Sequence, residues 1–361
     1  MPPVRVLIVD DSVVVRKLLS DALASTPGIQ LAGTASSGII ALAKIPQLNP
    51  DVITLDIEMP GLNGIQTLKE IRKLYPKLPV IMFSTLSEHG ASITLEALSL
   101  GASDYMAKPT NSESLAEAMG QVRGELTAKI LALVGRERIS GPPARSTATS
   151  KPAIGRSRID ILAIGTSTGG PNALAEVIPQ LPADFPVPAL VVQHMPPLFT
   201  RLLAERLNAQ SRIRVGEAEP GCTLEPGHLW IAPGDYHMTV LRKGLKATLE
   251  LNQDPPENSC RPAVDVLFRS VARAYGPNVL AVVMTGMGSD GTRGAGHIRE
   301  TGGEVFVQDE ASSVVWGMPG AVVNSGCANK ICSLAEISQE IVRRVQVGRT
   351  RGTLGAVAAP A

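Results

Sequence analysis

Short runs of consecutive apolar residues recur along this chain, and several end at a polar or glycine-rich turn. The first domain-sized stretch contains RVLIV, DVITL and PVIMF, and a later one contains DILAIG, PALVVQ and PNVLAVVM. Runs of this length that are apolar throughout are typical of strands buried in a parallel sheet. In the later stretch each run precedes a helical segment: PNALAEVIPQL, PPLFTRLLAERLNAQ or GTRGAGHIRETG. This alternation predicts an α/β fold whose second sheet is doubly wound and mostly parallel.

One segment between the second and third of these units departs from the scheme. HLWIAPGDYHMTVLRKGLKATLEL alternates apolar and polar residues on both sides of a central RKG. Alternation around a glycine-containing turn predicts a β-hairpin. We therefore expect a hairpin in addition to the parallel strands of the second sheet.

The chain divides into two domains, as a length of 361 residues favours. GELTAKILALVGRE is expected to form an amphipathic helix, and ISGPPARSTATSKPAIGRSR after it has no hydrophobic periodicity. Such a segment cannot bury enough apolar surface to offset its ordering entropy, so we expect a flexible tether. The predicted organisation is a first domain at 1–122, a helix and linker at 123–158, a second domain at 159–347 and a disordered tail at 348–361.

Composition excludes some classes of partner. The formal net charge is +1, which gives no electrostatic reason to expect nucleic acid or an anionic membrane as the main partner. No apolar run approaches the ~20 residues needed to span a bilayer, and the start of the chain lacks a signal-peptide pattern. We therefore expect a cytoplasmic protein. Its cysteines show no CxxC spacing and are expected to be free thiols: Cys222, Cys260, Cys327 and Cys332.

Charged and hydroxyl side chains stand at the ends of the apolar runs in the first domain. Asp10 and Asp11 end one run, Asp56 ends the next, and Ser84 and Lys108 end later ones. The carboxyl ends of parallel strands share one crevice, so these residues can converge. Three crowded carboxylates repel one another unless a hard cation such as Mg²⁺ lies among them. One carboxylate could then attack a phosphoryl group while the metal and the other two side chains hold its oxygens. The pattern predicts a phosphorylation switch that controls the rest of the chain.

Each of these pieces has a plainer explanation alone, because paired aspartates often cap helices and Lys-Pro often begins loops. Together and in this order, they resemble the receiver domain of two-component response regulators along nearly the whole first domain. The resemblance implies a flavodoxin-like fold with a five-stranded parallel sheet. One departure is TLSEHGAS after Ser84, which is a residue longer than in single-domain receivers. The resemblance also implies these roles: phospho-acceptor, Asp56; Mg²⁺ ligands, Asp10, Asp11, Asp56 and the carbonyl of Glu58; phosphoryl sensing, Ser84, Lys108 and the rearranging aromatic Tyr105.

The segment GTSTGGP joins a strand to a helix in the second domain. Its glycines permit a tight turn, and Pro171 suits the first helical turn. Ser167 would lie at the carboxyl edge of the strand, near the positive end of the helix dipole. Three interpretations compete: a helix cap, a phosphate-binding loop, or a GxSxG nucleophile elbow. The phosphate loop is the weakest sequence match, since the P-loop lysine and the full GxGxxG spacing are missing.

A serine nucleophile needs a base and a group that orients the base. His194 follows VVQ at the same sheet edge as Ser167, although a histidine there could also be a packed or capping residue. The orienting carboxylate is best sought in TGMGSDGTRG, where glycines would let the chain bend Asp290 into the crevice; Asp290 could instead be a helix N-cap. Asp235 and Asp309 are its rivals. The order Ser, His, Asp differs from that of α/β-hydrolases, but triads are defined by geometry. The remaining histidines lie elsewhere: His89, His228, His237 and His297.

A receiver and a tether followed by GTSTGG, QHMPP, IAPGD, TGMGSDG and QDEASSVVWGMPG closely resemble the bacterial chemotaxis response-regulator protein-glutamate methylesterase. The resemblance covers the chain apart from tether and tail. It implies Ser167 as nucleophile, His194 as general base and acid, Asp290 as orienter, and Thr168 and the N–H of Met287 near the oxyanion. The esterase is expected to need no cofactor of its own.

The resemblance also implies substrate and partners. The substrates are glutamate γ-methyl esters, and glutamines to be deamidated, on cytoplasmic helices of methyl-accepting chemoreceptors; the phosphodonor is the chemotaxis histidine kinase. The receiver is expected to inhibit the catalytic site until Asp56 is phosphorylated. The alternative is a response regulator whose output domain binds a partner without catalysis. A DNA-binding output is disfavoured, because the second domain lacks a basic helix-turn-helix.

Overall fold

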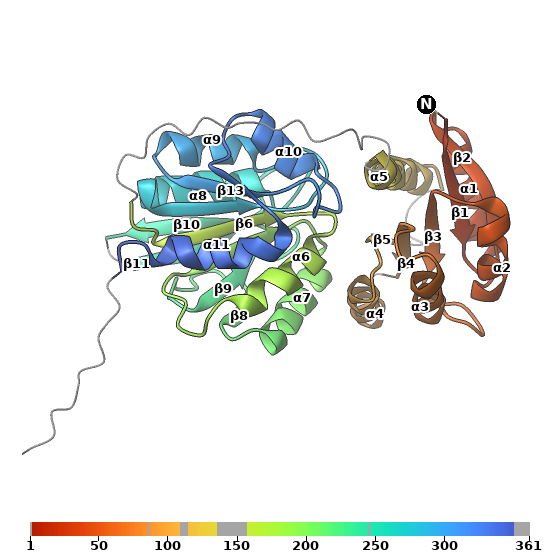
Figure 1. Ribbon diagram of the computed structural model, residues 1–361, viewed down its shortest axis with the longest axis horizontal. Coiled ribbons are helices and arrows are strands. Elements are labelled where there is room, and N and C mark those ends of the chain that lie inside the picture. Colours follow the sequence, from red (N-terminus) through yellow and green to blue (C-terminus); the bar gives the residue numbers. More distant parts are fainter. Residues whose placement is uncertain (1, 86, 109–114, 136–156, 245, 350–361) are drawn as a thin grey trace, which may run out of the picture.

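The computed structural model describes residues 2–85, 87–108, 115–135, 157–244 and 246–349, which form two α/β domains (Figure 1). The first is coloured red to yellow, and the second green to blue. The predicted tether and tail fall largely outside the described residues, at 136–156 and 350–361. Among the helices of the described ranges, none is long and apolar enough to cross a membrane.

The first domain is built on one parallel five-stranded sheet in the order β2-β1-β3-β4-β5. The strands β3 and β4 are buried at every residue, as their uninterrupted apolar runs predict. The strand order changes direction between β1 and β3, which places a crevice at their carboxyl ends. The strands are β1 (Val4–Val9), β2 (Ile29–Ala35), β3 (Val52–Asp56), β4 (Val80–Ser84) and β5 (Asp104–Ala107); the helices are α1 (Val13–Ala24), α2 (Gly38–Leu48), α3 (Gly64–Leu74), α4 (Glu88–Ser99) and α5 (Leu115–Gly135).

Helix α5 extends past the boundary that we expected at residue 122. The amphipathic segment assigned to the linker is its second half, and Leu126 and Ile130 are fully buried. They pack in one apolar cluster with Val6 of β1 and Leu19 of α1. The predicted helix is therefore part of the first domain, because its apolar side covers this sheet.

The second domain contains a parallel seven-stranded sheet in the order β14-β13-β12-β6-β7-β9-β8 and a separate antiparallel hairpin, β10-β11. The predicted hairpin is thus present, while HLWI before it forms β9 of the parallel sheet. The strands are β6 (Ile161–Thr166), β7 (Ala189–Gln193), β8 (Arg214–Glu217), β9 (His228–Ile231), β10 (His237–Lys243), β11 (Lys246–Asn252), β12 (Val279–Val283), β13 (Glu304–Gln308) and β14 (Lys330–Cys332). The helices are α6 (Gly170–Val177), α7 (Pro197–Gln210), α8 (Val264–Tyr275), α9 (Thr292–Glu300), α10 (Gly317–Asn324) and α11 (Leu334–Gln346), with 3₁₀ turns at Ile178–Gln180 and Gly276–Asn278.

Helices cover both faces of this second sheet (Figure 1). Alternate residues of β6 separate the two cores: Leu162 and Ile164 pack in the cluster that includes α6, α7 and α11, and Ile161 and Ala163 in the cluster that includes α8, α9 and α10. The first strand of the domain, β6, lies in the middle, with β7 on one side and β12 on the other. This switch point opens a crevice at the carboxyl ends of these strands.

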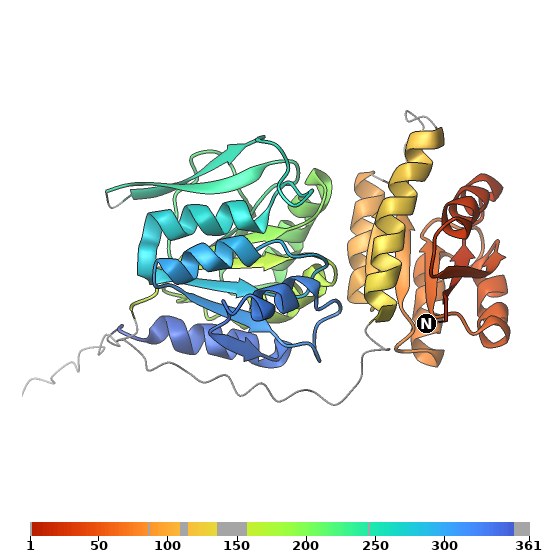
Figure 2. The same ribbon diagram turned by 90° about the horizontal axis from the view of Figure 1, so that it is seen from above.

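The first domain faces the second with α4, β5 and α5 (Figure 2), and α4 contacts α6 and α7. The ring of Tyr105 stacks on that of Phe199 with 4.7 Å between the centroids and 13° between the planes. Both side chains belong to one apolar cluster that continues from one domain into the other. Polar contacts across the interface join Asn172 Nδ2 to Leu98 O (2.8 Å), Arg201 to Glu88 (2.9 Å), and Arg206 Nη1 to Leu95 O.

Candidate active site and phosphorylation site

Ser167 lies in the tight turn that joins β6 to α6. The turn depends on glycine: Gly169 has a φ of +77°, and a Cβ on Gly170 would lie 1.9 Å from the side-chain oxygen of Gln193. A Cβ on Gly286, in the loop after β12, would lie 2.8 Å from Cβ of Ser167. The hydroxyl of Ser167 forms no hydrogen bond with the described residues and lines a cavity. It is therefore available to a substrate.

His194 follows the last residue of β7 and pairs with Asp290, which follows β12. The distance from His194 Nε2 to Asp290 Oδ2 is 2.8 Å, and the other ring nitrogen, Nδ1, lies 3.5 Å from Cys260 Sγ. The switch point thus brings together the ends of β6 and β7 and the loop after β12, where Ser167, His194 and Asp290 lie. No hydrogen bond joins Ser167 to His194 among the described residues.

Asp290 is fixed by backbone N–H groups as well as by His194. Its carboxylate accepts hydrogen bonds from the N–H groups of Val264 (2.6 Å), Asp265 (3.0 Å) and Gly291 (2.9 Å). Two of these donors begin α8, so the positive end of that helix faces the carboxylate. Burial alone would raise the pKa of Asp290, but the bonds from His194 and the backbone hold it below its ordinary value. Asp290 therefore remains ionised. It caps the start of α8 and not that of α9, which follows it in the chain.

The charge of Asp290 acts on the imidazole. Burial alone would lower the pKa of His194, but the hydrogen bonds to Asp290 and Cys260, together with their charges, raise it to about 9. The rival carboxylates have other partners. Asp235 pairs with Arg261 at 2.5 Å, and Asp309 accepts hydrogen bonds from Ser312. Neither is bonded to His194.

A cavity of about 570 Å³ lies between the two domains and is lined by Ser167, Thr168 and His194 from one side and by Asp104 and Lys129 from the other. The hydroxyl of Thr168 donates to Asp104 Oδ2 at 3.0 Å, and Lys129 Nζ lies 2.8 Å from the same oxygen. A receiver carboxylate is therefore bonded directly to the neighbour of Ser167. Met287, the other residue expected near the oxyanion, lies in the loop after β12 and is partly buried among apolar residues of the interface.

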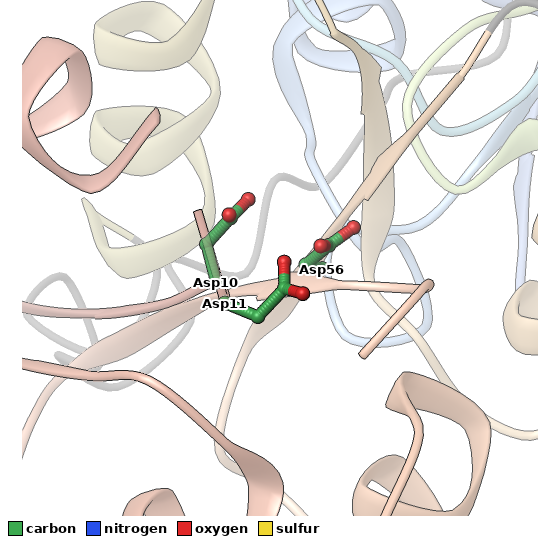
Figure 3. Close-up of side chains that lie close together, drawn as sticks. All are labelled: Asp10, Asp11 and Asp56. Carbon is green, nitrogen blue, oxygen red and sulfur yellow. The ribbon is translucent and has the colours of Figure 1, made fainter. Parts of the chain in front are cut away.

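The acidic residues of the receiver also converge. Asp10 and Asp11 follow β1, Asp56 ends β3, and Figure 3 shows the three side chains gathered at the sheet edge. One oxygen from each lies within 4.8 Å of the others. Lys108 Nζ lies 2.7 Å from Asp56 Oδ1 and 3.3 Å from Asp10 Oδ2. The arrangement brings the Lys108 ammonium group to the carboxylates.

This carboxylate group fits a hard divalent cation. Oδ2 of Asp56 is buried and accepts no hydrogen bond from the described residues, so an oxygen is left for a metal. Burial raises the pKa of Asp56 to about 6, although Lys108 opposes the rise. Glu58 follows in the next loop, and its N–H donates to Asp56 at 3.3 Å.

The two remaining residues that were predicted to sense a phosphoryl group have partners outside the acidic group. The Ser84 hydroxyl donates to the carbonyls of Gly90 and Thr85 at 3.0 and 3.1 Å. The ring of Tyr105 is buried against Phe199 of the other domain. Pro109 and Leu86, which belong to predicted motifs, lie outside the described residues. In this structure Ser84 is thus bonded to the start of α4, and Tyr105 is part of the domain interface.

Comparison with known proteins places the chain in a family. A CheB methylesterase model matches residues 162–341, and a response regulator receiver domain model matches residues 6–120. Proteins named protein-glutamate methylesterase/protein-glutamine glutaminase from Trichodesmium erythraeum and a Nocardioides species are 50% and 52% identical, over 96% of this chain and 100% and 96% of their own lengths. The chain belongs to the CheB methylesterase family. The crystal structure of the Thermotoga maritima CheB methylesterase catalytic domain is 41% identical, with a TM-score of 0.51, over 52% of this chain and 99% of that chain.

Membership of the CheB family confirms three predictions: the resemblance itself, the pair of α/β domains, and an enzyme of the protein-glutamate methylesterase/protein-glutamine glutaminase class. Sequence reasoning did not place Asp104, Asn258 or Cys260 at the site. The polar, proline-rich segment DPPENSCRP before α8 was a signal of an irregular loop. Nothing in its spacing indicated that the loop would lie against His194 and Asp290.

Proposed function

We propose that this member of the CheB family hydrolyses glutamate γ-methyl esters, and deamidates glutamines, on chemoreceptor cytoplasmic helices through Ser167, His194 and Asp290. The observation that carries the proposal is the His194–Asp290 pair, 2.8 Å apart, beside a cavity that Ser167 lines. Because Nε2 is bonded to Asp290, Nδ1 is the nitrogen that takes the serine proton. A buried, ionised Asp290 then stabilises the imidazolium.

The reaction passes through an acyl-enzyme. Ser167 Oγ attacks the ester carbonyl while its proton moves to His194. The N–H of Met287, which has no acceptor among the described residues, donates to the oxyanion together with Thr168. The tetrahedral intermediate collapses, His194 gives the proton to the leaving group, and methanol departs. Water, activated by His194, hydrolyses the acyl-enzyme to glutamate. A glutamine side chain follows the same steps and releases ammonia.

Phosphorylation of Asp56 controls this site in our proposal. The chemotaxis histidine kinase supplies the phosphoryl group, and Mg²⁺ held by Asp10, Asp11, Asp56 and the carbonyl of Glu58 would balance the charge of its oxygens. Lys108 already pairs with Asp56, so its ammonium group lies within reach of a phosphoryl group on that residue. Ser84 lies at the end of β4 beside Asp56 and can turn from the start of α4 toward a phosphoryl oxygen.

The docked receiver inhibits by two routes in this proposal. Its β5 and α5 line the cavity opposite Ser167, which would exclude a helix of a receptor. Its Asp104 also holds the Thr168 hydroxyl away from a developing oxyanion. Rearrangement of Ser84 and Tyr105 on phosphorylation would disturb both α4 and the stack on Phe199, and so shift the population toward an undocked form.

A serine-directed fluorophosphonate tests the catalytic proposal. The activated full-length chain should be labelled at Ser167 and should release methanol from methylated receptor, and Ser167→Ala should do neither. A binding module without catalysis would not be labelled. Methanol release by the Ser167→Ala variant at the rate of the parent would refute the assigned nucleophile.

A further inference from the structure

The loop between the hairpin and α8 closes over the His194–Asp290 pair. Asn258 and Ser259 both have positive φ, +53° and +62°, a conformation that few residues adopt readily. The loop is held at both ends by ion pairs: Glu257 to Arg269 at 2.5 Å, and Arg261 to Asp235 at 2.5 Å. Such anchoring fixes the position of the side chains between the two ends.

The amide nitrogen of Asn258 lies between two buried carboxylates. Asn258 Nδ2 is 2.8 Å from Asp290 Oδ1 and 3.0 Å from Asp265 Oδ2. Asp290 and Asp265 are only 2% and 1% exposed. An amide group has two N–H donors, so one can serve each carboxylate. Asn258 is therefore a bridge between the carboxylates and not a partner of one alone.

Each of the two carboxylates also accepts hydrogen bonds from the start of the neighbouring helix. Asp290, which precedes α9, accepts from the N–H groups of Val264 and Asp265 at the start of α8. Asp265, in the first turn of α8, accepts from the N–H of Gly294 in the first turn of α9 at 2.6 Å. Oδ1 of Asp290 is thus occupied by Asn258 and backbone donors. Oδ2 accepts from the N–H of Val264 and faces the imidazole.

We propose that Asn258 is a positioning residue for catalysis: its amide fixes the Asp290 carboxylate so that Oδ2 stays bonded to His194 Nε2. This inference rests on the proposed triad. Asn258 does not line the cavity, although the next three residues of the loop do, so it acts through Asp290 and not on the substrate. Without the amide, Asp290 loses a side-chain donor and its repulsion with Asp265 is no longer bridged. The carboxylate can then turn away from His194.

Asn258→Gly isolates the amide, because glycine accepts the positive φ without strain. Asn49 provides the matched control: it has a φ of +43°, is exposed, and lies in the receiver at the end of α2. Asn49→Gly removes the same group from the same backbone conformation far from the site. Asn258→Asp keeps the shape of the side chain but replaces the donor with an acceptor.

The assay uses the full chain with acetyl phosphate and Mg²⁺, and follows both methanol release and fluorophosphonate labelling. We expect Asn258→Gly to lower kcat about tenfold or more with KM unchanged, a change that corresponds to about 1.4 kcal/mol in the barrier. Labelling should slow in parallel but still reach the stoichiometry of the parent, which excludes a misfolded fraction. Asn258→Asp should be slower still, and Asn49→Gly should match the parent.

Several outcomes would overturn the inference. They are a parent-like kcat in Asn258→Gly, a parent-like rate in the isosteric Asn258→Asp, or reduced labelling stoichiometry with an unchanged rate per labelled site. The first would mean that the side chain is dispensable, the second that only its shape matters, and the third that it supports folding. Absence of Ser167 labelling in the parent chain is a different result, since it refutes the proposed function and the inference with it.

Discussion

Removing two hydrogen bonds across the domain interface should activate the chain without phosphorylation. Asn172 and Arg206 of the catalytic domain donate to the carbonyls of Leu98 and Leu95 in α4. Both donors lie outside the residues proposed for catalysis. Replacing both by alanine removes contacts that exist only when the receiver is docked, so the docked form should lose stability relative to the open form.

The expected size follows from the chemistry of the two donors. A neutral amide contributes about 1 kcal/mol and a charged guanidinium about 2 kcal/mol to the docked form. Together they correspond to about a hundredfold change in the ratio of open to docked molecules, since about 1.4 kcal/mol is a factor of ten. The basal rate of methanol release should rise by up to this factor. It should stop at the rate of the phosphorylated parent, where nearly every molecule is open.

Arg201→Ala is the control within the same interface. Its ion pair with Glu88 joins side chains that are 49% and 72% exposed, and such pairs contribute about 0 to 1 kcal/mol. Its basal rate should change only a few fold. The assay compares methanol release from methylated receptor with and without acetyl phosphate. An unchanged basal rate in the double variant, or an equal gain with and without acetyl phosphate, would refute inhibition by docking.

Three further predictions concern the two sites. Alanine at Ser167, His194 or Asp290 should lower turnover, and the triple variant should be little worse than the worst single variant; additive losses would contradict a triad. Asp56→Asn should abolish labelling by radioactive acetyl phosphate in Mg²⁺, and normal labelling would disprove the phospho-acceptor. The neutral form of His194 takes the serine proton, so a pKa of about 9 predicts that kcat rises with pH through that value. Asp290→Asn removes the raising charge and should move this rise to lower pH; an unmoved pH profile would show that Asp290 does not act on His194.

The sequence by itself determined the strands and what stands at their ends. Uninterrupted apolar runs identified β1, β3, β4, β6, β7 and β12, because a strand that is buried on both faces is apolar at successive residues. Polar residues after these runs then marked both crevices, since parallel strands end at one edge. The glycines around Ser167 and Asp290 indicated tight turns, because such turns restrict which residues can occupy them.

Contacts between segments remote in the chain were decided only by the tertiary structure. The amphipathic pattern of 124–135 showed a helix but not what it covers, and packing against β1 and α1 made it part of α5. Asp290 was predicted beside His194. Its contacts with α8 and Asn258 could not be predicted, because they depend on where the loop before α8 folds back. The stack of Tyr105 on Phe199 and the bond of Asp104 to Thr168 require two docked domains. Local patterns carry no record of such contacts, because a single buried polar residue has the same sequence signal whichever partner satisfies it.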